Sequence, residues 1–217
     1  MTAQDSDTQS RAPQTVFATV AIACFAYSAA VVALMHVLRP DLAPASHFVS
    51  EYALGLYGWM MGSSFLAMGL GCLMLMLGLV RIGIRSWVIW LGAGLLGVEF
   101  LGSLVGTIFP MDLPANPSTL TGRIHDMNFL VGIGGFSLAL LLLTMGFWSD
   151  PRWRSYRRTA LTLALLYVVA VILQFLTVRP GMPYGLANRF VFATFIAWPL
   201  GAAIHLWRVS RNTVAPS

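Results

Sequence analysis

Long apolar runs dominate the pattern of hydrophobic and polar positions along the chain. Six stretches are mainly apolar, covering residues 15–38, 58–79, 86–109, 124–148, 159–178 and 186–207. A helix needs about 20 mainly apolar residues to cross a bilayer, because every backbone polar group must be satisfied within the segment. Strands of a membrane barrel would alternate apolar and polar residues, whereas residues 138–143 are all apolar. We therefore predict an all-α, polytopic membrane protein built as a bundle of six transmembrane helices.

The composition excludes a soluble protein and narrows the chemistry. Apolar residues make up 58% of the chain and charged residues 10%, with a mean hydropathy of +0.76. A soluble domain carries roughly 25% charged residues. All thirteen basic residues are arginines, so a retinal Schiff base and other lysine-dependent covalent chemistry are excluded. These arginines stand singly or in one short cluster, so we expect no nucleic-acid partner.

The distribution of arginine predicts the topology. Nine lie in the N-terminal tail, the second and fourth connections and the C-terminal tail: Arg11, Arg81, Arg85, Arg152, Arg154, Arg157, Arg158, Arg208 and Arg211. Four lie in or near the other connections: Arg39, Arg123, Arg179 and Arg189. The positive-inside rule then places both termini in the cytoplasm. We expect a multi-pass protein of the plasma (inner) membrane, with a disordered tail over residues 1–14, one six-helix domain over 15–208 and a second cytoplasmic tail over 209–217.

Glu99 is the most informative polar residue, because it falls in the middle of the third apolar stretch. At 1.5 Å per residue it lies roughly 16 Å below the outer end of that helix. An ionised side chain at the bilayer centre costs about 2.5 to 3.5 kcal/mol on insertion scales. Glu99 is therefore expected to face the bundle interior, where it is either paired or protonated.

Most other polar side chains in the spans lie in their outer halves. They include Ser63, Ser64, His125, Asp126, Asn128, Gln174, Asn188 and Arg189. The inner halves carry far fewer polar groups. Buried polar side chains concentrated toward one side indicate a polar cavity that opens on that side.

Several short motifs occur in order along the chain. They are Ser50-Glu51-Tyr52 leading into Gly58-Trp59-Met60-Met61, Phe109-Pro110-Met111-Asp112, Gly122-Arg123-Ile124-His125, and Gly185-Leu186 followed by Asn188-Arg189. In these motifs the chain resembles domain-of-unknown-function family 998, from its first helix to its last. The resemblance implies a small prokaryotic membrane protein with six helices and implies no established reaction. Many family members carry an acid where this sequence has Asn188, which puts any acid-dependent role at that position in doubt.

The chemistry of these residues suggests roles around an outer pocket. The catalytic candidates are Glu99 and Asp112, as proton donors or acceptors, and His125, as a proton relay near neutral pH. The candidates for substrate binding are Ser50, Glu51, Asp126, Asn128, Asn188 and Arg189. Arg189 could pair with an acid (Glu51, Asp112 or Asp126) or hold an anionic head group. Each has a structural alternative: an ion pair for Arg189, a carbonyl bond for His125, a turn cap for Asp112 and a packing role for Glu99.

Three functions are compatible with such a pocket. The first is binding of a lipid head group or small amphiphile. The second is an intramembrane enzyme doing acid-base chemistry on a lipid or isoprenoid, and the third is a transporter or a subunit of a membrane complex. Whether the protein is an enzyme stays open. We expect membrane lipids as partners, and a homodimer through glycine-rich faces such as Gly102-xxx-Gly106 is possible.

Metal, haem and hydrolase sites find less support. The four histidines include no H-E-x-x-H motif and no pair spaced four residues apart. A bis-histidine haem needs two histidines at matching depth on facing helices, an arrangement that only His36 and His125 could approach. An outer zinc site of histidines and carboxylates is a further alternative. A hydrolase triad of Ser50, His125 and either Asp112 or Asp126 lacks a nucleophile elbow. We therefore expect no metal and no cofactor.

Overall fold

The computed structural model describes residues 3–83, 86–113, 118–179 and 181–212, with the backbone alone for residues 3–13 and 212. Within these ranges the elements are α1 (Ala3–Leu38), η1 (Val49–Ala53), α2 (Gly58–Arg81), α3 (Trp87–Ile108), α4 (Leu120–Phe147), η2 (Pro151–Trp153), α5 (Arg157–Thr177) and α6 (Tyr184–Asn212). The η elements are short 3₁₀ helices. All six α-helices are long and apolar enough to span a membrane, and the described residues form no strand. The predicted all-α six-helix bundle is confirmed.

The helix ends differ from the predicted spans where capping decides them. α4 begins at Leu120 rather than at residue 124, because the side chain of Thr119 accepts a hydrogen bond from the backbone N–H of Gly122 at 3.1 Å. α1 is helical from Ala3, where the sequence suggests an unstructured tail. The division into two tails and one membrane domain stays a prediction, and residues 213–217 of the second tail lie outside the described residues.

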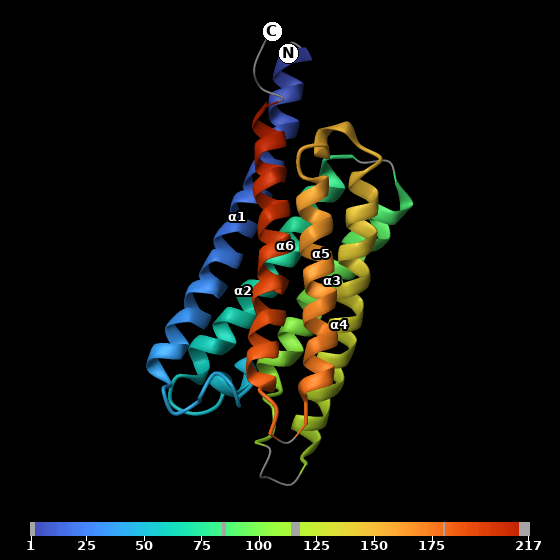
Figure 1. The fold of residues 1–217 in the computed structure, drawn as a ribbon. Helices are drawn as coiled ribbons and strands as arrows, with labels where there is room; N and C mark the ends of the chain where they lie inside the picture. Colours follow the sequence, from blue (N-terminus) through green and yellow to red (C-terminus); the bar gives the residue numbers. More distant parts are fainter. Residues whose placement is uncertain (1–2, 84–85, 114–117, 180, 213–217) are drawn as a thin grey trace.

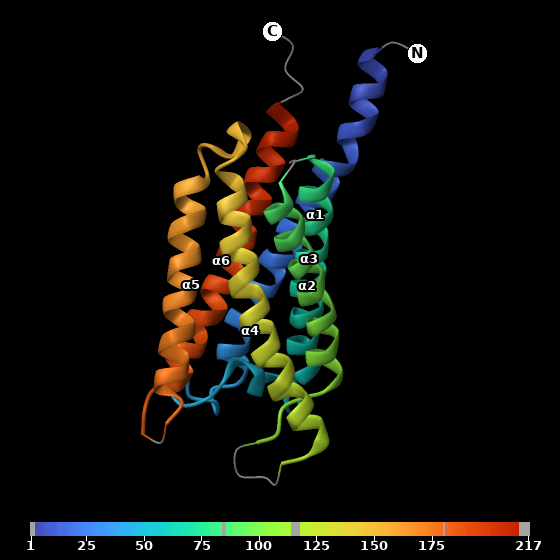
Figure 2. The same ribbon diagram turned by 90° about the vertical axis from the view of Figure 1, so that its right-hand side faces the viewer.

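The helices form a closed ring in chain order, in which each packs against the next and α6 packs against α1 (Figures 1 and 2). α2 also contacts α6 across the ring. Both chain ends lie at one end of the bundle (Figure 1), which we call the terminal end. The opposite end, which carries the connections 39–57, 109–119 and 178–183, is called the distal end. The backbones of α4 and α6 make few close approaches, and a cavity lies between these helices in part of the ring.

The aromatic core of the terminal end leaves no such space. The rings of Phe147 and Trp153 stack with centroids 3.8 Å apart, and Trp198 stacks on the same phenylalanine at 5.8 Å. The indole N–H of Trp198 donates to the carbonyl of Ala160 at 3.0 Å. Large aromatic side chains therefore close the terminal end and leave the interior space in the distal half.

Small residues set the spacing of neighbouring helices. A Cβ on Gly69 of α2 would lie 2.6 Å from the Cβ of Ser103 and 3.3 Å from the Cα of Phe100, both on α3. Gly102 and Gly106 of α3 face Asn128 of α4 in the same way. These glycines thus pack within one chain, and the predicted homodimer stays a prediction.

We predict that Gly69→Ala destabilises the bundle by about 1–3 kcal/mol, because the added methyl overlaps the backbone and side chains of α3. The matched control is Gly94→Ala on α3, whose Cβ would meet nothing within 4 Å. Thermal unfolding in detergent, followed by tryptophan fluorescence, should show a lower midpoint for Gly69→Ala alone. Equal midpoints for the two variants would contradict the observed α2–α3 contact.

An ion pair orders the connection between α4 and α5. Asp150 accepts a hydrogen bond from the backbone N–H of Arg152 at 2.9 Å, and the Arg152 guanidinium bonds its carboxylate. The same guanidinium donates to the carbonyl of Ile82 at 3.0 Å, beyond the end of α2. The Arg152 guanidinium holds the pKa of Asp150 below its usual value. The pair therefore ties two connections of the terminal end together.

This ion pair predicts a pH-dependent contribution to stability. Because the folded pKa of Asp150 is lowered, its contribution is complete above the unfolded pKa of about 3.9 and is lost as the pH falls through the lower folded value. At pH 7, Asp150→Asn should unfold at a lower temperature than the parent chain, and the difference should vanish in acid. Asp41→Asn is the control, because the Asp41 side chain is 59% exposed in its pair with Arg39. A pH-independent difference would contradict the assignment.

Candidate functional site

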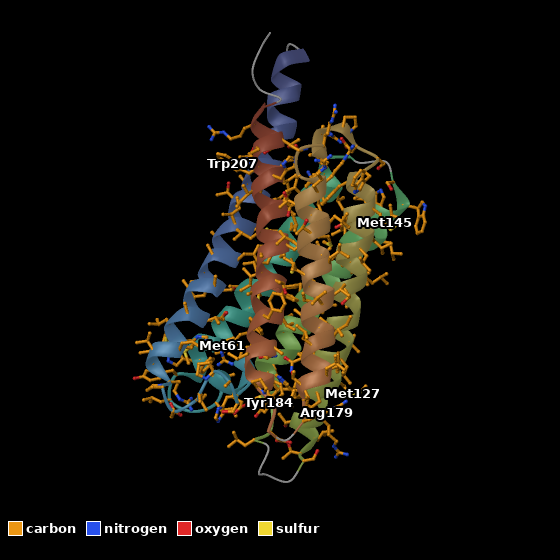
Figure 3. The ribbon with its side chains drawn as sticks, in the orientation of Figure 1. Met61, Met127, Met145, Arg179, Tyr184 and Trp207 are labelled. Carbon is orange, nitrogen blue, oxygen red and sulfur yellow. The ribbon has the colours of Figure 1, made fainter. Side chains whose placement is uncertain are left out.

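A cavity of about 130 Å³ lies inside the ring, between α3 and α4 on one side and α2, α5 and α6 on the other. Its polar lining residues are Ser50, Glu99, Ser103, His125, Asn128, Tyr167 and Asn188. Its apolar lining residues are Phe65, Met68, Phe129, Ile133, Val191, Phe192 and Phe195. Figure 3 shows Tyr184, Arg179 and Met127 at the distal end and Trp207 and Met145 toward the terminal end. Ser50 and His125, which lie near the distal connections, place the cavity in the distal half.

The structure brings together part of the predicted site. Five of the predicted residues line this one cavity: Ser50, Glu99, His125, Asn128 and Asn188. The other four, Glu51, Asp112, Asp126 and Arg189, are not among its lining residues. The catalytic and binding roles assigned to these residues stay predictions.

Glu99 lies on α3 and its side chain is buried, with 7% of the residue exposed. Its Oε1 atom has no hydrogen-bond partner among the described residues. Two glycines of α4 make room for the carboxylate, since a Cβ on Gly132 or on Gly135 would lie 3.6 Å from one of its oxygens. The expected interior position of Glu99 is thus observed, and the protein groups around the cavity leave its carboxylate without a counter-charge.

Tyr167 of α5 is the site residue that the sequence reasoning missed. It is fully buried, and its hydroxyl has no hydrogen-bond partner among the described residues. Ser137 is a candidate partner: its hydroxyl donates to the carbonyl of Ile133 at 2.7 Å, and its oxygen keeps the lone pairs that can accept the Tyr167 O–H. The available signal was a phenol in the middle of an apolar span, because a tyrosine hydroxyl in hydrocarbon needs a partner.

Three aromatic rings form the floor of the cavity beside Tyr167. Phe136 of α4 stacks on Phe195 of α6, with ring centroids 3.9 Å apart. The edge of the Tyr167 ring meets Phe136 at 5.2 Å. This contact joins α4, α5 and α6 below the cavity and separates it from the core of the terminal end.

His125 and Asn128, one turn apart on α4, hold the adjacent helix α3. The His125 Nδ1 atom lies 2.9 Å from the carbonyl oxygen of Phe109, and because a carbonyl only accepts, this nitrogen carries the proton. In the neutral imidazole the Nε2 atom is then an acceptor. The Asn128 amide donates to the carbonyl of Gly102 at 3.0 Å, which leaves its oxygen free to accept. Both side chains therefore combine a structural bond with one acceptor at the cavity wall.

The distal side of the cavity is covered by η1 and its neighbours. The Asn188 side-chain oxygen accepts a hydrogen bond from the backbone N–H of Val49 at 2.8 Å, which fixes η1 on α6. The Ser50 hydroxyl lies 3.0 Å from the sulfur of Met111 in the third connection. An acidic residue is therefore not required at position 188, because the amide oxygen of Asn188 accepts the hydrogen bond from Val49.

Arg189 organises this cover from outside the cavity. Its guanidinium donates to Nε2 of His36 at 2.8 Å, to the carbonyls of His47 and Gly185 at 2.7 and 3.0 Å, and to the hydroxyl of Tyr52 at 2.9 Å. It also lies over the Tyr52 ring, 5.6 Å from the centroid. The arginine therefore joins α1, the first connection and α6 through neutral acceptors.

The tautomer of His36 explains why this arrangement is stable. Its Nδ1 atom lies 2.7 Å from the carbonyl of Val32 and so carries the proton. Its Nε2 atom is then a lone-pair acceptor, which can receive the guanidinium N–H of Arg189 only while the ring is neutral. The histidine that the sequence reasoning considered only for haem is instead a partner of Arg189.

The three acids expected near Arg189 have other surroundings, and none of them pairs with it in the described part of the chain. Glu51 accepts the backbone N–H of Phe48 at 2.7 Å and so caps η1. Asp112 accepts the backbone N–H and the hydroxyl of Thr119 at 2.7 and 2.8 Å, which orders the start of α4. Asp126 is exposed. The expected ion pair with Arg189 was wrong, because local backbone donors occupy Glu51 and Asp112.

The comparisons with known proteins now identify the family. The family described as "Protein of unknown function (DUF998)" matches residues 17–205. The chain belongs to this family. No curated protein and no solved structure matches it. In this DUF998 protein, the motifs that carried the resemblance build η1, the third connection and the starts of α4 and α6, which surround the distal end of the cavity.

We predict that Arg189→Lys loosens the distal cover, because an ammonium cannot reach all four acceptors that the planar guanidinium reaches. Leaving buried acceptors without donors should cost about 1–3 kcal/mol. Arg179→Lys is the control, since Arg179 is exposed in the fifth connection. Thermal unfolding and limited proteolysis within residues 39–57 measure the effect. Equal protease resistance of the two variants would rule out the joining role of Arg189.

Proposed function

We propose that this DUF998 protein binds a small amphiphile or a lipid head group in the distal cavity. The observation that carries the proposal is a buried polar atom at the cavity, Oε1 of Glu99, which has no hydrogen-bond partner among the described residues and shares the cavity with the hydroxyl of Tyr167. A buried polar group without a partner costs about 1–3 kcal/mol. A bound polar head group would satisfy both atoms.

The size and lining of the cavity favour a small head group rather than a whole lipid. An apolar cavity of about 150 Å³ holds one benzene molecule, and the present cavity measures about 130 Å³. A polar group of about six heavy atoms therefore fits. Phe65, Phe129 and Phe192 supply apolar walls for the first carbons of a chain. One polar wall and one apolar wall suit an amphiphile.

The proposed location is the plasma membrane, with both termini in the cytoplasm and the distal end outside. It is supported by the excess of arginine at the terminal end, which the positive-inside rule assigns to the cytoplasm. In that orientation the cavity serves the outer half of the bilayer and takes its ligand from membrane lipids.

A pair of leucine substitutions on α4 tests the binding function. Gly132→Leu places a side chain in the cavity beside Glu99. The side chain added by Gly134→Leu, two residues further along α4, points into open space. Native mass spectrometry of the purified protein should show a retained amphiphile with the parent chain and with Gly134→Leu. Gly132→Leu should lose it.

Thermal unfolding separates loss of the ligand from loss of the fold. If Gly132→Leu does not fold, Gly132→Ala supplies the smaller change, since its Cβ makes only ordinary contact at 3.6 Å with the Glu99 carboxylate. Retention of the same amphiphile by folded Gly132→Leu, or a parent chain that carries and binds none, would overturn the proposal.

A second candidate, acid-base catalysis on a bound lipid, is favoured by one observation. Glu99 and His125 line the same cavity from adjacent helices, and the Nε2 atom of His125 remains an acceptor. Asp112 is engaged with Thr119 outside the cavity lining, so it gives this candidate no support. Glu99→Gln decides the matter. A catalyst would retain a molecule of different mass in this variant than in the parent chain, whereas a binding protein would retain the same molecule or none.

A further inference from the structure

The charges around the cavity are one-sided. Glu99 is the ionisable acid of the lining, and no arginine belongs to the lining. The chain contains no lysine at all. Arg189, which the sequence suggested as a partner for an acid, donates to His36, Tyr52 and two backbone carbonyls instead. The lining thus places hydroxyl, amide and imidazole groups and apolar surface around a buried carboxyl group, and no arginine or lysine among them.

Two further polar residues of the lining, Asn128 and His125, can accept hydrogen bonds from a ligand. The Asn128 amide nitrogen is bonded to Gly102 and the His125 Nδ1 atom to Phe109, so each side chain offers an acceptor atom. A ligand that brings N–H groups would match these atoms, whereas an anionic ligand would find no arginine or lysine in the lining to pair with. An anion is therefore the poorest match among simple head groups.

The apolar walls also suit a cation. Phenylalanines from α2, α4 and α6 line the cavity, together with the ring of Tyr167 on α5. The faces of aromatic rings attract organic cations, and the attraction reaches about 2 kcal/mol when the site is desolvated. An alkylammonium group is compact enough for the cavity and presents apolar carbons to the rings.

We propose that the ligand of this cavity is a cationic amphiphile, a primary or quaternary amine on an apolar chain, whose nitrogen lies against the Glu99 carboxylate. This inference rests on the proposed binding function and names its ligand class. The amine supplies the counter-charge that the described residues leave out, and the aromatic rings enclose its carbon substituents. A primary amine would in addition donate to Asn128 or His125.

Three probes with the same chain length test the charge preference: dodecyltrimethylammonium, dodecanol and dodecanoate. Binding to the protein in nanodiscs of zwitterionic lipid is measured by titration and by native mass spectrometry. We expect the ammonium probe to bind about tenfold more tightly than dodecanol, because Coulombic attraction to the Glu99 carboxylate and cation–π contact with the rings add to the same apolar burial. Dodecanoate should bind most weakly.

Substitutions at Glu99 test whether this residue causes the preference for a cationic ligand. Glu99→Gln should lower the affinity for dodecyltrimethylammonium about tenfold and leave dodecanol unchanged. Glu99→Asp keeps the charge and should keep the preference for the cation, while Gly134→Leu is the control outside the cavity. Thermal unfolding confirms that each variant is folded before its affinity is compared.

The possible outcomes separate this inference from the proposed function. If dodecanol binds as tightly as the ammonium probe, or if Glu99→Gln leaves the preference unchanged, the ligand class is wrong and the binding function stands. Tighter binding of dodecanoate would overturn the ligand class in the same way. If no probe binds to the parent chain, both the ligand class and amphiphile binding in this cavity are refuted.

Discussion

Hydrocarbon offers no hydrogen-bond partners, and this constraint governs every polar group in the bundle. Most of the polar side chains described here meet it with backbone atoms of the same or a neighbouring helix. Asn128 bonds a carbonyl of α3, and His125 bonds the residue that ends that helix. Glu99 and Tyr167 lack such bonds among the described residues, although both are buried. Thr144, Trp153 and Gln174 also carry buried side-chain atoms without a partner among the described residues, but of these five residues only Glu99 and Tyr167 line the cavity.

The position of that exception follows from the way the ring is closed. Aromatic rings of α4, α5 and α6 seal the interior below Tyr167. At the other end, Arg189 and Asn188 hold η1 over the helix ends through acceptors that carry no charge. Between these two layers, glycines of α4 withhold the side chains that would otherwise fill the space beside Glu99. A small, mostly apolar cavity with a few polar groups is the result.

Arginine has two separate uses in this protein, and their difference bears on function. Arg152 neutralises an acid in a connection of the terminal end. Arg189 binds neutral oxygens and a neutral imidazole, so its positive charge is spread over dipoles and not cancelled by a carboxylate. Since Arg189 does not line the cavity, the carboxyl group of Glu99 sets the electrostatic character of the site.

The amino-acid sequence by itself determined the six spans and the inward position of Glu99, because hydropathy and the cost of a buried charge act within one helix. For Asp112 the sequence suggested a turn cap as one alternative, and the structure showed that its carboxylate bonds Thr119 at the start of α4. Only the tertiary structure decided that Arg189 meets His36 and Tyr52 instead of an acid, and that Tyr167 shares a cavity with Glu99. Those pairings join helices far apart in the chain, and which helices become neighbours, and how they are rotated, depends on packing across the whole ring.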